Sequence, residues 1–204
     1  AMLILFATLL EKGSEVIISD PHYACYPNFI RFFEGSPICV QVNECDGFQY
    51  TPEAIRERVS SRTRAVLINS PSNPTGNLLS RERMAEIASL GIPIVSDEIY
   101  HGLVYEEEEH SILEFTDNAF VLNGFSKAYA MTGWRLGYLI APREFVRPLQ
   151  KIQQNFYISA GSISQWAGVA ALREAGPDVA KMRSVYDERR KYMIGRLREL
   201  GFGL

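Results

Sequence analysis

Residues 64 to 76 read RAVLINSPSNPTG, and this stretch decides the fold class. Its first seven residues are mostly apolar and do not alternate with polar ones, which is typical of a strand covered on both faces in a mostly parallel sheet. Polar, turn-forming residues follow at once, so a loop begins where the strand ends. Similar apolar runs recur along the chain: EVIISD (15–20), PICVQVN (37–43), IPIVSDE (92–98), AFVLNGF (119–125) and GYLIAP (137–142).

Helical patterns separate most of these runs, and Thr51 and Ser80 are suitable N-cap residues for two of the helices. The alternation predicts an α/β fold, with three α/β/α layers around a mixed, mostly parallel sheet. No long helix separates 119–125 from 137–142, so we expect these two strands to be antiparallel neighbours.

The last third of the chain is predicted to be helical. Apolar residues recur at helical spacing over 142–157, 162–175 and 178–200, and the last of these stretches has one apolar face. The acidic run EEEE at 106–109 is expected to be an exposed turn.

Composition argues against several classes of function. The chain has 204 residues and a net charge of −3, which is unlike a nucleic-acid-binding surface. Cys25, Cys39 and Cys45 have neither metal-ligand spacing nor an even count, so we expect free thiols in a reducing cytoplasm and no metal site. The apolar opening AMLILFATLL is too short to span a bilayer, which predicts a core helix and no membrane partner.

Four predicted strands end in polar segments, namely SDPHY, NSPSNPTG, SDEIY and NGFSK. Ligands of open α/β sheets bind at the carboxyl ends of strands, so these segments predict a site. Lys127 lies just beyond one of these ends. Partial burial there would lower the pKa of its amine and make it nucleophilic, whereas a lysine considered alone would be a surface charge.

Taken together, these motifs resemble a known family. NPTG (73–76), DEIY (97–100) and SK (126–127), followed by Gly133, Arg135 and Gly137, are similar in order and spacing to the large domain of fold-type I pyridoxal phosphate (PLP) enzymes. Within that group they resemble the class I/II aminotransferases of the aspartate aminotransferase family. The resemblance extends over nearly the whole chain.

The resemblance implies PLP as cofactor and a role for each residue. Lys127 would bind the cofactor aldehyde covalently and then act as the base that moves the substrate proton. Asp97 would keep the ring nitrogen protonated. Tyr100 and Asn73 would reach the phenolic oxygen of the cofactor, and Asn73 would also touch the substrate carboxylate. The bond between Asn73 and Pro74 is expected to be cis.

Three further residues are implied to contact the cofactor. Arg135 would bind the phosphate with its bidentate fork, and Tyr23 would stack on the ring. Ser126 lies where the family often places a phosphate-contacting hydroxyl. Some members place that hydroxyl three residues before the lysine, where this chain has Gly124.

The resemblance also implies how the chain is organised. We expect residues 1–175 to be a large PLP-binding domain that lacks its N-terminal part. Residues 176–204 would be a long helix leading toward a missing small domain. The full protein would be a cytoplasmic homodimer that transfers an amino group between an amino acid and a 2-oxo acid. The piece alone would bind PLP weakly and would not turn over.

Other functions stay open. The same residues suit a PLP-dependent C–S lyase, because the cofactor supplies the electron-sink chemistry and the protein selects the bond that breaks. A non-catalytic effector domain of a transcription regulator is the second alternative. A plain α/β domain with coincidental motifs is the third.

Overall fold

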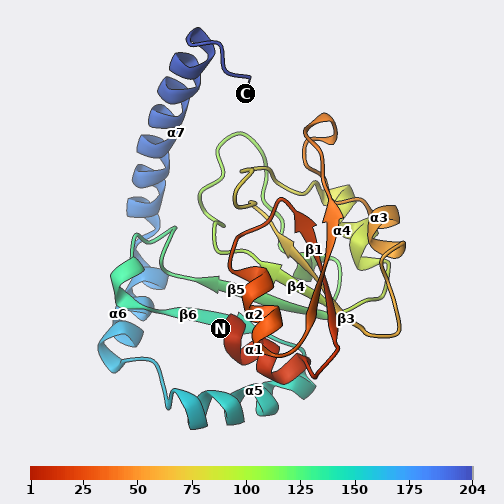
Figure 1. Ribbon diagram of the computed structural model, residues 1–204. Helices are drawn as coiled ribbons and strands as arrows, with labels where there is room; N and C mark the ends of the chain where they lie inside the picture. The colour runs from red at the N-terminus through yellow and green to blue at the C-terminus, as the bar shows by residue number, and fades with distance from the viewer. Residues whose placement is uncertain (204) are drawn as a thin grey trace.

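The computed structural model describes residues 1–203 and shows one sheet between two layers of helices (Figure 1). The strands are β1 (Glu15–Asp20), β2 (Ser36–Gln41), β3 (Thr63–Asn69), β4 (Ile94–Asp97), β5 (Ala119–Gly124) and β6 (Gly137–Ile140). The helices are α1 (Met2–Leu9), α2 (Tyr26–Phe32), α3 (Pro52–Arg56), α4 (Arg81–Ala88), α5 (Arg143–Phe156), α6 (Ser162–Glu174) and α7 (Gly176–Glu199).

The strand order is β2-β1-β3-β4-β5-β6. All neighbouring strands are parallel except β5 and β6, which are antiparallel. The predicted mixed, mostly parallel sheet and its antiparallel pair are therefore confirmed. Strand β4 begins two residues later than predicted, after Pro93, which has no backbone N–H to donate to a neighbouring strand.

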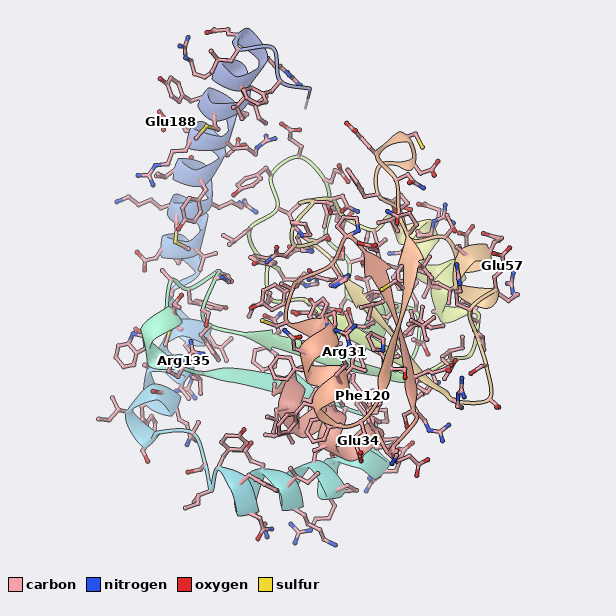
Figure 2. All side chains as sticks on the ribbon, in the orientation of Figure 1. Arg31, Glu34, Glu57, Phe120, Arg135 and Glu188 are labelled. Carbon is pink, nitrogen blue, oxygen red and sulfur yellow. The ribbon has the colours of Figure 1, made fainter. Side chains whose placement is uncertain are left out.

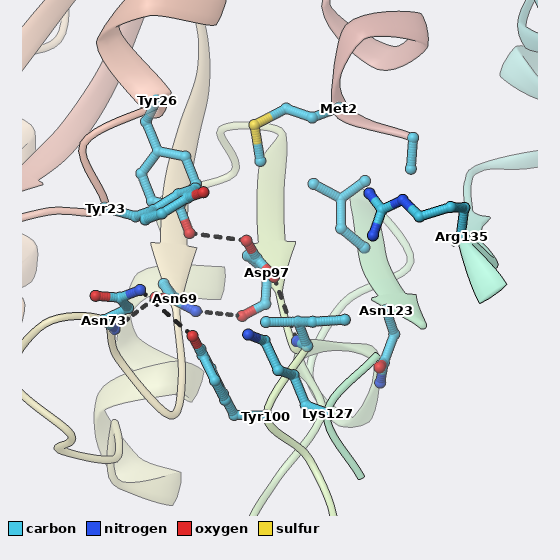
Figure 3. Close-up of a pocket in the computed structure, with 13 residues that line it drawn as sticks. Met2, Tyr23, Tyr26, Asn69, Asn73, Asp97, Tyr100, Asn123, Lys127 and Arg135 are labelled. Carbon is cyan, nitrogen blue, oxygen red and sulfur yellow. Dashed lines mark hydrogen bonds between the residues drawn. The ribbon is translucent and has the colours of Figure 1, made fainter. Parts of the chain in front are cut away.

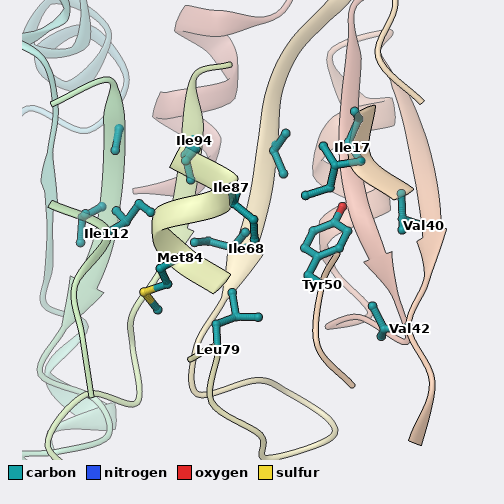
Figure 4. Close-up of a cluster of buried hydrophobic side chains, with 14 residues drawn as sticks. Ile17, Val40, Val42, Tyr50, Ile68, Leu79, Met84, Ile87, Ile94 and Ile112 are labelled. Atoms are coloured by element: carbon teal, nitrogen blue, oxygen red, sulfur yellow. The ribbon is translucent and has the colours of Figure 1, made fainter. Parts of the chain in front are cut away.

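The central strands send alternate side chains into two separate cores, as the period of two in a strand requires. One core packs under α3 and α4 (Figure 4), and its strand residues include Ile17, Val66, Ile68, Ile94 and Val121. The other packs against α1, α2 and α5, and its strand residues include Ile18, Leu67, Val95, Phe120 and Leu122. Because both faces are covered, the strands show the nearly continuous apolar runs seen in the sequence.

The predicted helix starts are present as well. The Thr51 hydroxyl accepts from the Ala54 N–H at 3.4 Å, and the Ser80 hydroxyl accepts from the Arg83 N–H at 3.2 Å. Helix α1 buries Ile4, Leu5 and Phe6 in the second core, which confirms the predicted core helix. No helix within residues 1–203 combines the length and apolar character needed to cross a membrane.

Helix α7 extends away from the sheet, with side chains on all its sides (Figures 1 and 2). The predicted long helix is confirmed, but none of its residues is buried. Its expected apolar face is largely open, since Tyr186 and Met193 are exposed. The predicted division at residues 175 and 176 coincides with the junction of α6 and α7, and the assignment of domains stays a prediction.

Helix α2 and two further cis bonds add to what the sequence predicts. Helix α2 has no counterpart among the predicted helices. The Asn73–Pro74 bond is cis as expected, and so are Asp20–Pro21 and Ser70–Pro71. The three cysteines are free, and residues 1–203 contain no group of three or more acidic, histidine or cysteine side chains placed to hold a metal ion.

Candidate active site

The carboxyl ends of the central strands surround a cavity of about 400 Å³ (Figure 3). This size is within the range of small-molecule sites. Six of the seven predicted site residues line it or approach it from different strand ends and loops. The lining residues are Ala1, Met2, Tyr23, Tyr26, Asn69, Asn73, Asp97, Ile99, Tyr100, Leu122, Asn123, Lys127 and Arg135.

Strand register brings the first of these residues together. Asn69 ends β3 and Asp97 ends β4, and the parallel pairing places them opposite each other. The Asn69 side chain donates to the Asp97 carbonyl oxygen at 2.8 Å and accepts from the Asn73 N–H at 2.8 Å. One amide therefore fixes the loop that carries Asn73 relative to the end of β4.

Asp97 points into the cavity from the face covered by α1 and α2. Its carboxylate accepts from the Tyr26 hydroxyl at 2.8 Å and from the Ile99 N–H at 3.2 Å. Burial raises the pKa of the Asp97 carboxyl, and the hydrogen bonds from Tyr26 and Ile99 oppose that rise. A cationic partner in the cavity would favour the charged carboxylate, so the site suits a protonated ring nitrogen.

Tyr100, Asn73 and Lys127 lie beside Asp97. The Asn73 side-chain amide donates to the Tyr100 hydroxyl at 3.3 Å, and the Lys127 Nζ atom lies 5.4 Å from the centre of the Tyr100 ring. Lys127 itself is exposed, so the expected partial burial of this lysine is wrong. It stands at the mouth of the cavity, where no described segment covers it from solvent.

Arg135 and Tyr23 also line the cavity, as expected. Arg135 has a backbone φ of 52°, and its guanidinium donates to the Thr132 carbonyl oxygen at 2.9 Å. Tyr23 is 40% exposed, so its ring is open to a ligand. Ser126 is absent from the described lining residues, and its carbonyl oxygen accepts from the Thr132 hydroxyl at 2.8 Å.

Three polar lining residues, Tyr26, Asn69 and Asn123, are missing from the sequence prediction. Asn69 stands in the polar segment at the end of β3, so its position at a strand end was an available signal. Tyr26 lies within α2 and reaches Asp97 across 71 positions of the chain. No local pattern marks such a contact.

The donors and acceptors around the cavity fit PLP. Asp97 offers a carboxylate for a ring nitrogen, Tyr100 and Asn73 offer polar hydrogens for a ring oxygen, and Lys127 offers an amine for an aldehyde. Arg135 supplies a cation for a phosphate. The ring nitrogen, ring oxygen, aldehyde and phosphate of PLP therefore each have a complementary side chain at this cavity.

Comparison with known proteins agrees with this geometry. The sequence profile of the family described as "Aminotransferase class I and II" matches residues 1–204. The chain belongs to this family. Class I and II aminotransferases generally depend on PLP.

Individual relatives and solved structures match nearly all of this chain and about half of their own length. The chain is 42% identical to a (5-formylfuran-3-yl)methyl phosphate transaminase of Methanocaldococcus jannaschii, over 96% of this chain and 52% of the relative. It is 37% identical to an aspartate aminotransferase of Pyrococcus horikoshii, over 96% and 52%. A Thermus thermophilus aspartate aminotransferase structure superposes with a TM-score of 0.96 at 34% identity, over 99% of this chain and 55% of that one. The chain thus spans about half the length of the curated relatives it matches.

Proposed function

We propose that the protein containing this chain is a PLP-dependent aminotransferase. The observation that carries the proposal is the convergence of Lys127, Asp97 and Tyr100 on one cavity, in a chain that belongs to the class I and II aminotransferases. Asn73, Arg135 and Tyr23 line the same cavity and add further contacts that PLP would use.

Bound PLP supplies an aldehyde that joins amines reversibly and a ring that draws electrons from the substrate. The Lys127 amine would hold the aldehyde end and, once released, carry the proton taken from the substrate carbon. The Asp97 carboxylate would keep a proton on the ring nitrogen. Tyr100 and Asn73 would donate toward the ring oxygen, and Asn73 would also contact the substrate carboxylate.

The remaining residues would orient the cofactor. The Arg135 guanidinium would bind the phosphate with two parallel hydrogen bonds, and the exposed Tyr23 ring would pack on the pyridine. A phosphate contact of Ser126 stays a prediction, and Ser126 is not among the described residues that line the cavity.

We propose an amino acid and a 2-oxo acid as the substrates. The relatives include proteins named aspartate aminotransferase and aspartate/prephenate aminotransferase, which favours acidic amino donors. A homodimer and a cytoplasmic location stay predictions from the resemblance. Sedimentation of the purified protein tests the first, and fractionation of cells tests the second.

The decisive experiment compares the protein that contains residues 1–204 with its Lys127→Ala variant after addition of PLP. We expect the parent to show a PLP absorbance band, and borohydride should attach PLP irreversibly to Lys127. The parent should also transfer an amino group from aspartate or glutamate to a 2-oxo acid. The variant should lack both. Lys181→Ala, a change of an exposed lysine in α7, is the matched control and should behave like the parent.

Two results would contradict this proposal. If the Lys127→Ala variant had the same PLP band as the parent, Lys127 would not be the residue that binds the cofactor aldehyde. Release of pyruvate, ammonia and the thiol leaving group from cystathionine, without need of an acceptor, would show β-elimination in place of transfer.

A further inference from the structure

The acidic run at 106–109 is only partly the exposed turn that its composition suggests. Glu106, Glu107 and Glu108 are exposed, whereas Glu109 is half-buried. Both oxygens of the Glu109 carboxylate accept from the Gly102 N–H, at 2.9 and 2.8 Å. The Glu109 carboxylate therefore binds one specific backbone N–H of the protein.

Gly102 belongs to the tight turn that presents Tyr100 to the cavity. In this turn the His101 N–H donates to the Glu98 carbonyl oxygen at 3.0 Å, and the Leu103 N–H donates to the Tyr100 carbonyl oxygen at 3.1 Å. Gly102 has a φ of +88°, which side chains rarely allow. The Glu109 carboxylate thus binds the backbone two residues from Tyr100.

The same glycine touches the segment that carries Lys127. A Cβ atom at Gly102 would lie 3.2 Å from the Cβ of Ala128, the residue after Lys127. Only a residue without a side chain allows the two turns to approach this closely. The position of Gly102 therefore affects how the Tyr100 ring and the Lys127 amine face each other.

The loop that carries Glu109 is anchored on both sides. Before Glu109, the Glu106 carboxylate pairs with Arg190 of α7 at 2.5 Å. After Glu109, the Ser111 hydroxyl donates to the buried Glu98 carboxylate at 3.1 Å. A loop held at two points keeps the Glu109 side chain in place at a low entropic cost.

We propose that Glu109 is a positioning residue, which holds the Tyr100 turn against the Lys127 segment and thereby sets the geometry of both toward the cofactor. The proposal rests on the proposed function, because the consequence is expressed through PLP. Glu109 does not line the cavity, so it acts through the Gly102 backbone and not by contact with a ligand.

The test compares Glu109→Ala and Glu109→Gln with Glu108→Ala in the protein that contains residues 1–204. Glu108 is the neighbouring exposed acid and the matched control. We measure the PLP dissociation constant, the pH midpoint of the PLP absorbance change, and the melting temperature. Glu109→Ala should weaken PLP binding about tenfold, the size of one lost charge-assisted hydrogen bond, and should displace the pH midpoint.

Glutamine keeps the size of the side chain and one acceptor oxygen, so Glu109→Gln should recover most of the affinity. Glu108→Ala should match the parent. If Glu109→Ala does not fold, the glutamine variant decides the question, because its single acceptor should still leave a measurable shift of the pH midpoint.

Two outcomes would overturn the inference. In the first, the Glu109 variants melt earlier but keep the affinity and the pH midpoint of the parent, which would make Glu109 a purely structural residue. In the second, Glu108→Ala has the same effect as Glu109→Ala, which would show that the effect comes from the net charge of the loop and not from the bond to Gly102. A parent without any PLP band would refute the proposed function itself, and this result is distinct from both.

Discussion

The two faces of the sheet at the end of β4 use a carboxylate in different ways. Asp97 lies on the face covered by α1 and α2, and it lines the cavity. Glu98 lies on the opposite face and is only 2% exposed. Its carboxylate accepts from the Ser96 hydroxyl at 2.9 Å, from the Ser111 hydroxyl at 3.1 Å and from the Ile112 N–H at 3.0 Å.

The difference lies in what is left for a ligand. A carboxylate offers about four acceptor positions. On Glu98 the chain donates three hydrogen bonds to one oxygen, and His101 Nδ1 lies 3.5 Å from the other. The side chain is almost fully buried, so Glu98 is a structural group. Asp97 receives hydrogen bonds from Tyr26 and Ile99 and still faces an open cavity, at the cost of a raised pKa. Of these neighbouring acids in one motif, Asp97 is thus open to a ligand on one face, whereas Glu98 is bound by the protein itself on the other.

The largest expected effect comes from Asp97→Asn. The variant keeps the size of the side chain and an acceptor for Tyr26 but loses the charge that would hold a proton on the ring nitrogen. We expect the rate of amino transfer to fall at least about 10²- to 10³-fold, as when one preorganised electrostatic group is removed. Steady-state kinetics with a saturating donor measures this fall, and a variant within a few-fold of the parent would contradict it.

The same variant should gain stability without cofactor. Burial raises the pKa of Asp97 in the folded state, while an unfolded aspartate has a pKa of about 3.9. The folded state binds more protons between these two values, so the stability of the parent falls as pH rises through this window. Asp97→Asn has no such penalty. Its advantage in urea unfolding should vanish below about pH 3.9 and grow as the pH rises toward the raised pKa of Asp97.

On the other face, Glu98→Ala should mainly affect folding. It leaves Ser96, Ser111 and the Ile112 N–H without their common acceptor in a buried region. We expect a loss of about 3 kcal/mol in the free energy of unfolding. Glu98→Gln keeps an acceptor oxygen and should lose less than half of that. Equal losses in the two variants would show that Glu98 stabilises the fold through its negative charge and not as a hydrogen-bond acceptor.

The contrast between Asp97 and Glu98 also shows what sequence can predict. All six strands coincide with predicted apolar runs, and the signal is strongest for β1, β3, β4 and β5, because both faces of these central strands are buried. The convergence of Asn73, Asp97 and Lys127 follows from their places at strand ends. Glu98 stands in the same motif as Asp97. It lies on the other face because side chains alternate along β4, and its hydrogen-bond partners Ser111 and Ile112 come from a later segment.

The unpredicted features depend on contacts between distant segments. Tyr26 meets Asp97 only once α2 has packed on the sheet, and the helix itself is short and has a proline in its first turn. The exposure of Lys127 depends on what covers the cavity mouth, which its neighbours in sequence do not determine. The open apolar face of α7 likewise has the spacing of a buried helix without the partner that would cover it.

Asn69→Asp tests whether the binding face depends on the bridge between β3 and β4. Aspartate still accepts from the Asn73 N–H, but it cannot donate to the Asp97 carbonyl oxygen. It also adds a negative charge beside Asp97. We expect PLP affinity about tenfold lower by absorbance titration. Asn118→Asp changes an exposed amide near the opposite ends of the strands and should leave the affinity unchanged; equal effects would rule out a specific bridge.

Tyr26→Phe should give the smallest effect, and it tests a single hydrogen bond to Asp97. The change removes only the hydroxyl that donates to the Asp97 carboxylate at 2.8 Å, so the pKa of Asp97 should rise further. We expect about 1 kcal/mol less stability at neutral pH, measured by urea unfolding. Tyr50→Phe is the matched control. That tyrosine is equally buried, but its hydroxyl has no hydrogen-bond partner among residues 1–203, so its removal should cost nothing. Similar losses in both variants would mean that packing, and not the bond to Asp97, explains the effect.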